Sequence, residues 1–345
     1  MRHAIVVASR FHPHPNPRVG AVLLTSAGDV ISEAGHTGPG NPHAERALLD
    51  AVSPLPDDAV LVVTLEPCAH TGRTPPCADA VVASGVRTVV VGSVDPDSRV
   101  AGTGIARLRE AGIEVIVGVE SEAVEEADPG YFHHRRTGRP LVTLKQATTL
   151  DGQLAAADGT SQWITGEEAR RNAHHLRAAH DAILVGAGTV RSDDPRLDVR
   201  LDGFDGPQPV PVIVAGSRPL PPDLRLWNRN PIVLASEELR MDGVDVIRAG
   251  TGGVVDLDAA LRQLPDRGIL SVLVEGGAGV AAGLWNAGLI DRGVHYFGAK
   301  VAGGAGRGAF DRVFTTLGEA IDVEITSVSR LGADLRVDWR RATHS

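Results

Sequence analysis

The chain has 345 residues, which predicts two domains, because a single domain usually has ~100–200 residues. Its 34 basic and 43 acidic residues leave a net charge of −9, which disfavours a general binder of nucleic acids or of anionic membranes. A hydrophobic fraction of 43% fits a folded globular protein. No apolar run reaches the ~20 residues of a membrane span, and the first residues lack the apolar core of a signal peptide. We therefore expect a cytoplasmic protein.

Residues 1–120 alternate strand-like and helix-like segments, which predicts an α/β domain with some parallel strands. The expected strands are Val19–Thr25, Ala59–Leu65, Arg87–Ser93 and Ile113–Val119. The expected helices are Ala44–Ala51, Ala78–Ala83 and Gly104–Ala111. Gly112 follows the last of them and is a natural residue to end a helix.

Residues 121–140 interrupt this alternation. They are polar and charged and contain Pro129-Gly130 and Gly138-Arg139-Pro140, so we expect a linker there. Residues 141–345 return to the α/β pattern and predict a second domain. Its expected strands are Leu141–Gln146, Ala182–Val185, Val210–Ala215, Pro231–Ala235 and Ile269–Val274, and its expected long helix is Glu167–Ala179.

Cys68 and Cys77 are the only cysteines, too few for a disulfide framework. Residues 42–45 read Pro-His-Ala-Glu and open a predicted helix, and the two cysteines follow a predicted strand. Two thiolates and the imidazole of His43 suit a tetrahedral zinc site with one position left for water. Glu45 can then carry protons without binding the metal. His-x-Glu followed by Pro-Cys and a second cysteine is the signature of zinc deaminases.

His70 lies between the two cysteines and has two possible roles. As a fourth ligand it would close the site and make the zinc structural, since structural zinc sites have four protein ligands. Otherwise it contacts the substrate from the loop between the cysteines. Taken singly, each of these residues also has an ordinary explanation, because most histidines and cytosolic cysteines are surface or core residues.

The spacing of the cysteines points to one branch of the deaminases. Eight residues separate them, in Pro-Cys-Ala-His-Thr-Gly-Arg-Thr-Pro-Pro-Cys at 67–77. This segment, Pro-Asn-Pro-Arg-Val-Gly at 15–20 and the stretch 94–102 resemble the deaminase half of the bifunctional riboflavin-biosynthesis enzymes. Those enzymes join a diaminohydroxyphosphoribosylaminopyrimidine deaminase to a 5-amino-6-(5-phosphoribosylamino)uracil reductase. The resemblance implies a cytidine-deaminase-like α/β/α domain in which Asn16 contacts the substrate.

The second half is similar to the reductase half of the same family. The segments concerned are 145–152, 161–165, 176–179, 186–200 and the strand and glycines at 271–283. The resemblance implies a dihydrofolate-reductase-like α/β domain that uses NADPH. The glycines at 277–283 do not follow the spacing of a Rossmann motif, so that fold is disfavoured.

The resemblance also implies roles for residues of this half. Lys145 and Glu275 would be catalytic. The substrate would be held by Ser161, Arg177, Leu197, Arg200 and Glu275. The cofactor would be held by Ala147, Trp163, Thr189, Asp193, Gly277, Ala278, Gly279, Val280, Ala281, Ala282 and Gly283. Ser217 and Arg218 follow a predicted strand and are candidates for the 2′-phosphate of NADPH.

The resulting prediction is a cytoplasmic enzyme with Zn²⁺ and NADPH, and with no nucleic-acid or membrane partner. It would hydrolytically deaminate 2,5-diamino-6-ribosylamino-4(3H)-pyrimidinone 5′-phosphate and then reduce the ribosyl group to a ribityl chain. We expect a homo-oligomer, a dimer or a tetramer. Two alternatives remain open at this stage: a deaminase of nucleic-acid bases, and a zinc-stabilised binding or regulatory protein without activity.

Overall fold

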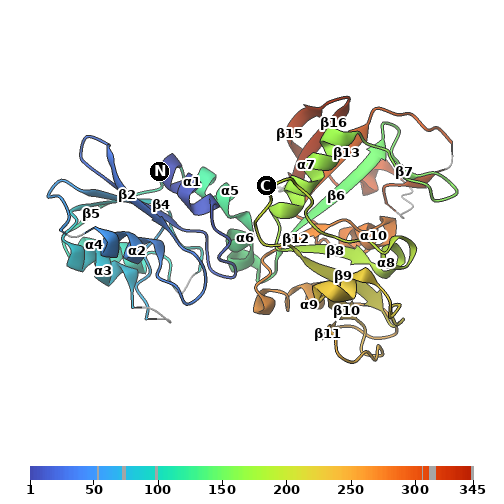
Figure 1. The fold of residues 1–345 in the computed structure, drawn as a ribbon, viewed down its shortest axis with the longest axis horizontal. Coiled ribbons are helices and arrows are strands. Elements are labelled where there is room, and N and C mark those ends of the chain that lie inside the picture. Colours follow the sequence, from blue (N-terminus) through green and yellow to red (C-terminus); the bar gives the residue numbers. More distant parts are fainter. Residues whose placement is uncertain (53, 72–74, 98–99, 305, 311–315, 343–345) are drawn as a thin grey trace. The chain divides into compact units, whose positions relative to one another are not determined.

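The computed structural model describes residues 1–52, 54–71, 75–97, 100–304, 306–310 and 316–342. The chain divides into two compact units, Met1–Gly138 and Arg139–Ser345 (Figure 1). Both are α/β, as the sequence predicts. Parts of the motifs at 67–77 and 94–102 lie outside the described residues, at 72–74 and 98–99. No helix in the described part of the chain is long and apolar enough to cross a membrane.

Within the described residues, the first unit has a five-stranded sheet in the order β2-β1-β3-β4-β5. The strands are β1 (Gly20–Leu24), β2 (Val30–Gly35), β3 (Val60–Leu65), β4 (Thr88–Ser93) and β5 (Glu114–Val117). Strands β3, β4 and β5 are parallel, and β1 is antiparallel to both its neighbours. The parallel strands end at one edge of the sheet, where sites in α/β proteins are usually built.

The helices of this unit are α1 (Arg2–Ser9), α2 (Ala44–Ala51), α3 (Cys77–Ser84), α4 (Thr103–Glu110), α5 (Ser121–Ala127) and α6 (Pro129–Thr137). Residues 121–140, expected to be a linker, thus form two helices and belong mostly to the first unit. Asp128 explains why this polar segment is ordered. Its buried carboxylate accepts hydrogen bonds from the backbone of Arg18 and from Tyr131, and contacts His14 at 2.8 Å.

Among the described residues, the second unit has a nine-stranded sheet in the order β11-β10-β9-β8-β12-β6-β13-β16-β15. The strands are β6 (Leu141–Thr149), β8 (Ala182–Gly186), β9 (Val210–Gly216), β10 (Ile232–Ala235), β11 (Asp245–Arg248), β12 (Ser271–Val274), β13 (Arg292–Gly298), β15 (Val323–Leu331) and β16 (Asp334–Arg341). Neighbours from β11 to β13 are parallel, and β16 and β15 add an antiparallel hairpin. Strands β7 (Gln153–Ala155) and β14 (Arg307–Gly308) pair separately.

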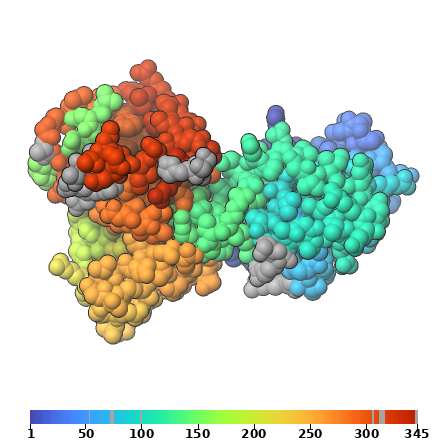
Figure 2. All heavy atoms as spheres, turned by 180° about the vertical axis from the view of Figure 1, so that it is seen from behind, coloured from blue at the N-terminus to red at the C-terminus, as the bar shows by residue number. Residues whose placement is uncertain are grey.

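Helices cover both faces of this sheet, so most of its parallel strands are buried on both sides. The helices of this unit are α7 (Glu167–Ala178), α8 (Ala187–Asp193), α9 (Leu257–Leu261) and α10 (Ala278–Asn286), and it also has short 3₁₀ segments at 225–229, 265–267 and 317–319. Leu261 and Leu284 enter one apolar core, and Val190 and Leu226 enter the other. Residues towards the C-terminal end, orange to red, cover much of this unit's surface seen from behind (Figure 2).

Candidate active sites

The first site joins two loops and two helix starts. His43 directly precedes α2, Cys68 follows β3, and Cys77 is the first residue of α3. Their ligand atoms all lie within 4.8 Å of one another. His43 Nδ1 is 3.2 Å from the sulfur of Cys77 and 3.6 Å from that of Cys68. Two sulfurs and one imidazole nitrogen, pre-assembled in this way, fit a zinc ion.

The two cysteine thiols of this site have shifted pKa values. The hydrogen bond from Cys77 lowers the pKa of Cys68 to about 4. The same bond, together with burial, raises the pKa of Cys77. Both sulfurs bind a metal as thiolates, so metal binding would release the remaining proton.

Glu45 stands two residues after His43, in the first turn of α2. Its side chain is buried, with 3% of the residue exposed. Burial, together with the negative charge of Cys68, raises its pKa to about 7. A carboxylate with a pKa near neutrality can both accept and release a proton. Its position and pKa are those required of an acid/base group beside the three ligands.

The loop that carries Cys68 is anchored by Glu66, which the sequence analysis did not identify. Its buried carboxylate accepts hydrogen bonds from the backbone of Asp95, Gly102, Gly104 and Ile105 at 2.8–3.3 Å. Glu66 thereby ties the end of β3 to the start of α4, where an anion is favoured by free amides. Glu66 stands two residues before Cys68, and that closeness was the available signal.

Asn16, the expected substrate contact, is held by a second histidine. Asn16 Nδ2 is 2.8 Å from Nε2 of His36, and Nδ1 of His36 is 3.1 Å from the carbonyl oxygen of Pro42. Nδ1 must donate to that carbonyl, so Nε2 is free to accept from the amide of Asn16. The ring of His36 stands edge-on to that of His43, with 5.1 Å between centroids. Asn16 is thus brought close to the three metal-binding residues.

His70 is exposed and is not part of the cluster of metal-binding side chains found among the described residues. The cluster contains three protein ligands, which leaves a position for water. The site therefore has the composition of a catalytic zinc centre and not that of a closed structural one.

The second site lies in the other unit, around Glu275, which follows β12. Arg177 on α7 donates to Glu275 from Nε at 2.6 Å and from Nη2 at 2.9 Å. Lys145 on β6 places Nζ 3.9 Å from the same carboxylate. Burial would raise the pKa of Glu275, but the charges of Lys145 and Arg177 outweigh it and lower this pKa to about 2. Glu275 is therefore ionised at neutral pH.

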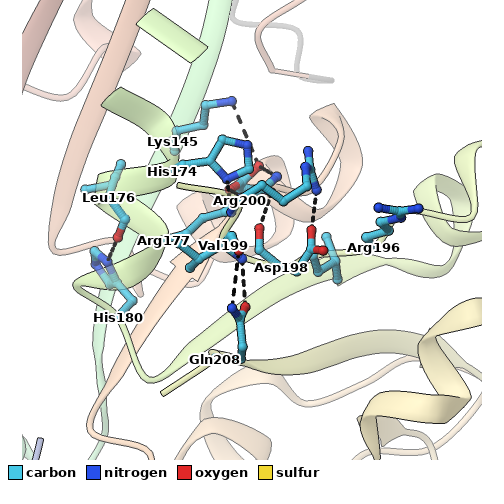
Figure 3. Close-up of polar contacts among 12 residues, drawn as sticks. Lys145, His174, Leu176, Arg177, His180, Arg196, Asp198, Val199, Arg200 and Gln208 are labelled. Atoms are coloured by element: carbon cyan, nitrogen blue, oxygen red, sulfur yellow. Dashed lines mark hydrogen bonds and ion pairs between the residues drawn. The ribbon is translucent and has the colours of Figure 1, made fainter. Parts of the chain in front are cut away.

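The loop at 196–200 lies beside Arg177 (Figure 3). Arg177 donates from Nη1 to the carbonyl oxygen of Asp198. Gln208 clamps Val199 by accepting from its N–H at 2.7 Å and donating to its carbonyl. Arg229 donates to the carbonyl of Leu197 at 2.6 Å. The loop is therefore shaped by hydrogen bonds to its backbone.

Two expected substrate contacts take different positions in this loop. The side chain of Leu197 is buried in the apolar core, and its φ of 51° turns the chain, so its backbone alone is left to meet a substrate. The guanidinium of Arg200 is half exposed and pairs with Asp198. The sequence analysis missed His174, which accepts a hydrogen bond from the backbone N–H of Arg200. His174 stands three residues before Arg177 in the predicted helix, and this spacing indicates that the two side chains lie on the same side of it.

The expected cofactor segments meet beside this site. Gly186 is the last residue of β8 and Gly276 follows β12, and a Cβ atom on either would lie within 3.0 Å of Val280. The bare backbone thus lets the starts of α8 and α10 approach each other. Thr189 on α8 is near Gly277, which begins α10 without a side-chain cap. Free amides at a helix start suit a phosphate, so these residues fit a dinucleotide such as NADPH.

The remaining expected residues of 277–283 divide by face. Ala281 and Ala282 lie on the buried face of α10, whereas Gly277 and Gly279 are exposed at the start of this helix. Asp193, at the end of α8, accepts from Ser192 and is exposed. Ala147 lies on β6 two residues from Lys145, at the edge of the α7 core.

A pocket opens beside the end of β6. Ser161, Trp163, Thr149 and Lys300 contribute to its lining, and Trp163 is 60% exposed. Arg170 lies over the Trp163 ring at 4.5 Å. The pocket therefore brings Ser161 and Trp163 together, two residues that the resemblance linked to substrate and cofactor.

These two sites define a class of protein: a zinc-type deaminase centre and a nucleotide-type reductase site on one chain. Residues 1–93 match the family model described as cytidine and deoxycytidylate deaminase zinc-binding region, and residues 140–337 match the RibD C-terminal domain. The riboflavin biosynthesis protein RibD of Chlamydia muridarum is 40% identical, covering 97% of this chain and 94% of the relative.

Solved structures agree along the whole chain. RibD of Acinetobacter baumannii is 34% identical, with a TM-score of 0.91 over 99% of this chain and 98% of the other. A diaminohydroxyphosphoribosylaminopyrimidine deaminase/5-amino-6-(5-phosphoribosylamino)uracil reductase from Thermotoga maritima is 36% identical, with a TM-score of 0.89 over 99% and 97%. The chain belongs to the RibD family, the bifunctional deaminase/reductases of riboflavin biosynthesis. The predicted family, fold, activities and cofactors, Zn²⁺ and NADPH, are confirmed.

Proposed function

We propose that Met1–Gly138 is the deaminase domain and Arg139–Ser345 the reductase domain, and that each expected site residue acts in its own unit. The observation that carries this proposal is the separation of two complete constellations. His43, Cys68 and Cys77 surround one position next to buried Glu45. Lys145 stands next to Glu275 in the other unit.

In the deaminase domain, His43, Cys68 and Cys77 would hold zinc, which when bound activates a water molecule by lowering its pKa to ~7. Glu45 accepts the proton of the attacking water and returns it to the departing amine, so a ring amino group becomes a carbonyl and ammonia leaves. Asn16 donates to His36, so its oxygen is free to accept from an N–H of the substrate. His70 would contact the substrate from the loop between the cysteines.

In the reductase domain, NADPH would lie along the start of α10, at 277–283, with Thr189, Asp193, Ala147 and Trp163, and it supplies hydride when bound. The acceptor is C1′ of the ribosyl group in its ring-opened form. Hydride on C1′ must be matched by a proton on the nitrogen of the C1′=N bond, and Lys145, whose ammonium lies 3.9 Å from Glu275, would orient the substrate or donate that proton.

The ionised Glu275 lies 3.9 Å from the Lys145 ammonium, and Arg177 holds Glu275 with two hydrogen bonds. Arg177 therefore positions the carboxylate, and the substrate phosphate or hydroxyls would be left to Ser161, Arg200 and the backbone of Leu197. Arg200 is the more accessible of the two arginines, with 49% of its side chain exposed against 15% for Arg177.

We also propose that the chain forms a homo-oligomer and works in the cytoplasm. The two thiols of the metal site must stay reduced to bind zinc, which a reducing compartment ensures. The proposed partners are a small pyrimidine ribosyl phosphate, zinc and NADPH.

The test uses 2,5-diamino-6-ribosylamino-4(3H)-pyrimidinone 5′-phosphate and two variants that serve as each other's control. Glu45→Gln should keep its zinc content but lose ammonia release by at least about 100-fold. It should still oxidise NADPH with the deaminated substrate. Lys145→Met should release ammonia normally and fail to oxidise NADPH. Normal ammonia release by Glu45→Gln, or normal NADPH oxidation by Lys145→Met, would contradict the assigned role.

A further inference from the structure

His174 on α7 holds the loop at 196–200 by one backbone atom. The N–H of Arg200 donates to Nδ1 of His174 at 3.2 Å. Three residues further along the same helix, Arg177 donates from Nη1 to the carbonyl oxygen of Asp198 at 2.8 Å. Residues three apart on a helix lie on the same side of it, and both side chains point towards the loop (Figure 3). Helix α7 therefore fixes the backbone of this loop at two residues.

The bond to His174 differs from the other bonds to this loop because it depends on the protonation state of a side chain. Gln208 binds Val199 through an amide, which does not titrate, and the guanidinium of Arg177 stays charged. An imidazole accepts a hydrogen bond at Nδ1 only while that nitrogen carries no proton. When the ring takes up a proton, both nitrogens become donors and the bond from Arg200 is lost.

The surroundings of His174 keep its ring neutral at neutral pH. The charged groups around the ring come from α7, the loop, the residue after β12, and β6, and they are Arg177, Arg200, Asp198, Glu275 and Lys145. Burial lowers the pKa of His174 below its usual 6.5, and the charges of the two arginines lower it further. The two carboxylates act in the opposite sense but do not outweigh these effects. At pH 7 the ring is therefore an acceptor, and it becomes a cation only in acid.

We propose that His174 is a positioning residue of the reductase site, which holds the backbone of Arg200 for substrate binding and releases it when the ring is protonated. The amide nitrogen is bonded to the Cα atom that carries the Arg200 side chain, so releasing this amide frees the base of that side chain. The inference rests on the proposed role of Arg200 in substrate binding. It implies that substrate affinity falls in acid through a group of the protein, in addition to the substrate's own phosphate, which takes up a proton near pH ~6.

The first test needs neither substrate nor activity. It measures by NMR how fast the amide of Arg200 exchanges with deuterium in the full-length, zinc-loaded chain. His174→Leu removes the acceptor, so this amide should exchange at least about 3-fold faster than in the wild type. His174→Asn places a side-chain oxygen where Nδ1 stands and should retain slow exchange. His175→Leu, at the exposed neighbouring residue of the same helix, is the matched control and should behave as the wild type.

The second test measures KM for the deaminated substrate in NADPH oxidation, from about pH 8 to about pH 5. At the alkaline end, His174→Leu should raise this KM roughly 3–10-fold, the effect of one hydrogen bond, with a smaller change in kcat and in KM for NADPH. In acid, the KM of the wild type should rise towards that of His174→Leu. His174→Asn cannot gain the proton, so it should show only the rise that is due to the substrate phosphate, which all variants share.

The two tests separate this inference from the proposed function on which it rests. Unchanged exchange of the Arg200 amide in His174→Leu would overturn the hold by His174. An equal rise of KM in acid for the wild type and His174→Asn would overturn the release on protonation. Faster exchange with an unchanged KM would instead contradict the role of Arg200 in substrate binding. Ammonia release and the melting temperature of each variant confirm that it is folded.

Discussion

The ion pair between Arg177 and Glu275 lends itself to a quantitative test. Arg177→Met would remove two charge-assisted hydrogen bonds, of 2.6 and 2.9 Å, from a carboxylate whose side chain is 10% exposed. Breaking a buried pair from one side costs ~3–5 kcal/mol. Lys145 remains 3.9 Å away and still offsets part of the buried charge. We therefore expect the lower end of this range, about 3 kcal/mol.

Thermal unfolding of the reductase domain measures this loss. A domain of this size should melt about 6–12 °C lower for ~3 kcal/mol. NADPH oxidation should fall because Glu275 is no longer held, while ammonia release by the same protein serves as an internal control. Arg171→Met, an exposed arginine on the same helix, should change neither quantity.

A double variant separates stability from activity. Replacing both partners by apolar residues removes the uncompensated charge, so Arg177→Met/Glu275→Leu should regain much of the lost stability. It should not regain NADPH oxidation, because Lys145 has lost its carboxylate. If Arg177→Met melts with the wild type, or if the double variant is less stable than the single one, the pair does not act as we describe.

Three further outcomes are expected. Gly104→Ala should lower zinc content and ammonia release but not NADPH oxidation, because the new Cβ would lie 1.8 Å from the carbonyl oxygen of Pro67, beside the zinc ligand; metal analysis and both assays check this. Arg139→Met should destabilise the reductase domain by about 2 kcal/mol in denaturant titrations, since it removes two charge-assisted hydrogen bonds from half-buried Asp291, which keeps its bond from the backbone N–H of Val142. The folded pKa of Glu275, about 2, is below its usual 4.5, so its contribution to stability is present above pH 4.5 and lost towards pH 2. The stability that Arg177→Met loses relative to the wild type should therefore become smaller in acid, as unfolding measured at a series of pH values would show.

The sequence predicts the parts of this fold whose cause is local. Ala44–Ala51 is a helix as expected, because its apolar residues follow helical spacing. The strand expected at 182–185 forms β8, because an unbroken apolar run suits a strand buried on both faces. Polar segments were harder to interpret. Asp128 orders 121–137 through contacts with His14 and Arg18, more than a hundred residues away, and no local pattern reveals such partners.

The same limit applies to the sites. The motif at 43–45 and the two cysteines together indicate a zinc site, because zinc selects ligand types and spacings that are visible in a sequence. His36 and Glu66 act through bonds to Asn16 and to backbone amides, and neither has a metal-binding pattern of its own. Supporting residues of this kind are recognised only when the chain is folded.

A motif also leaves open which atom of a residue does the work. Leu197 and Arg177 both belong to segments that resemble the family, and both were expected to hold the substrate. In the fold, the Leu197 side chain is in the core, while its carbonyl accepts from Arg229. The guanidinium of Arg177 donates its hydrogen bonds to Glu275 and to the carbonyl of Asp198. A resemblance can thus place residues at a site, but the division between groups that touch substrate and groups that hold them follows from burial and hydrogen bonding.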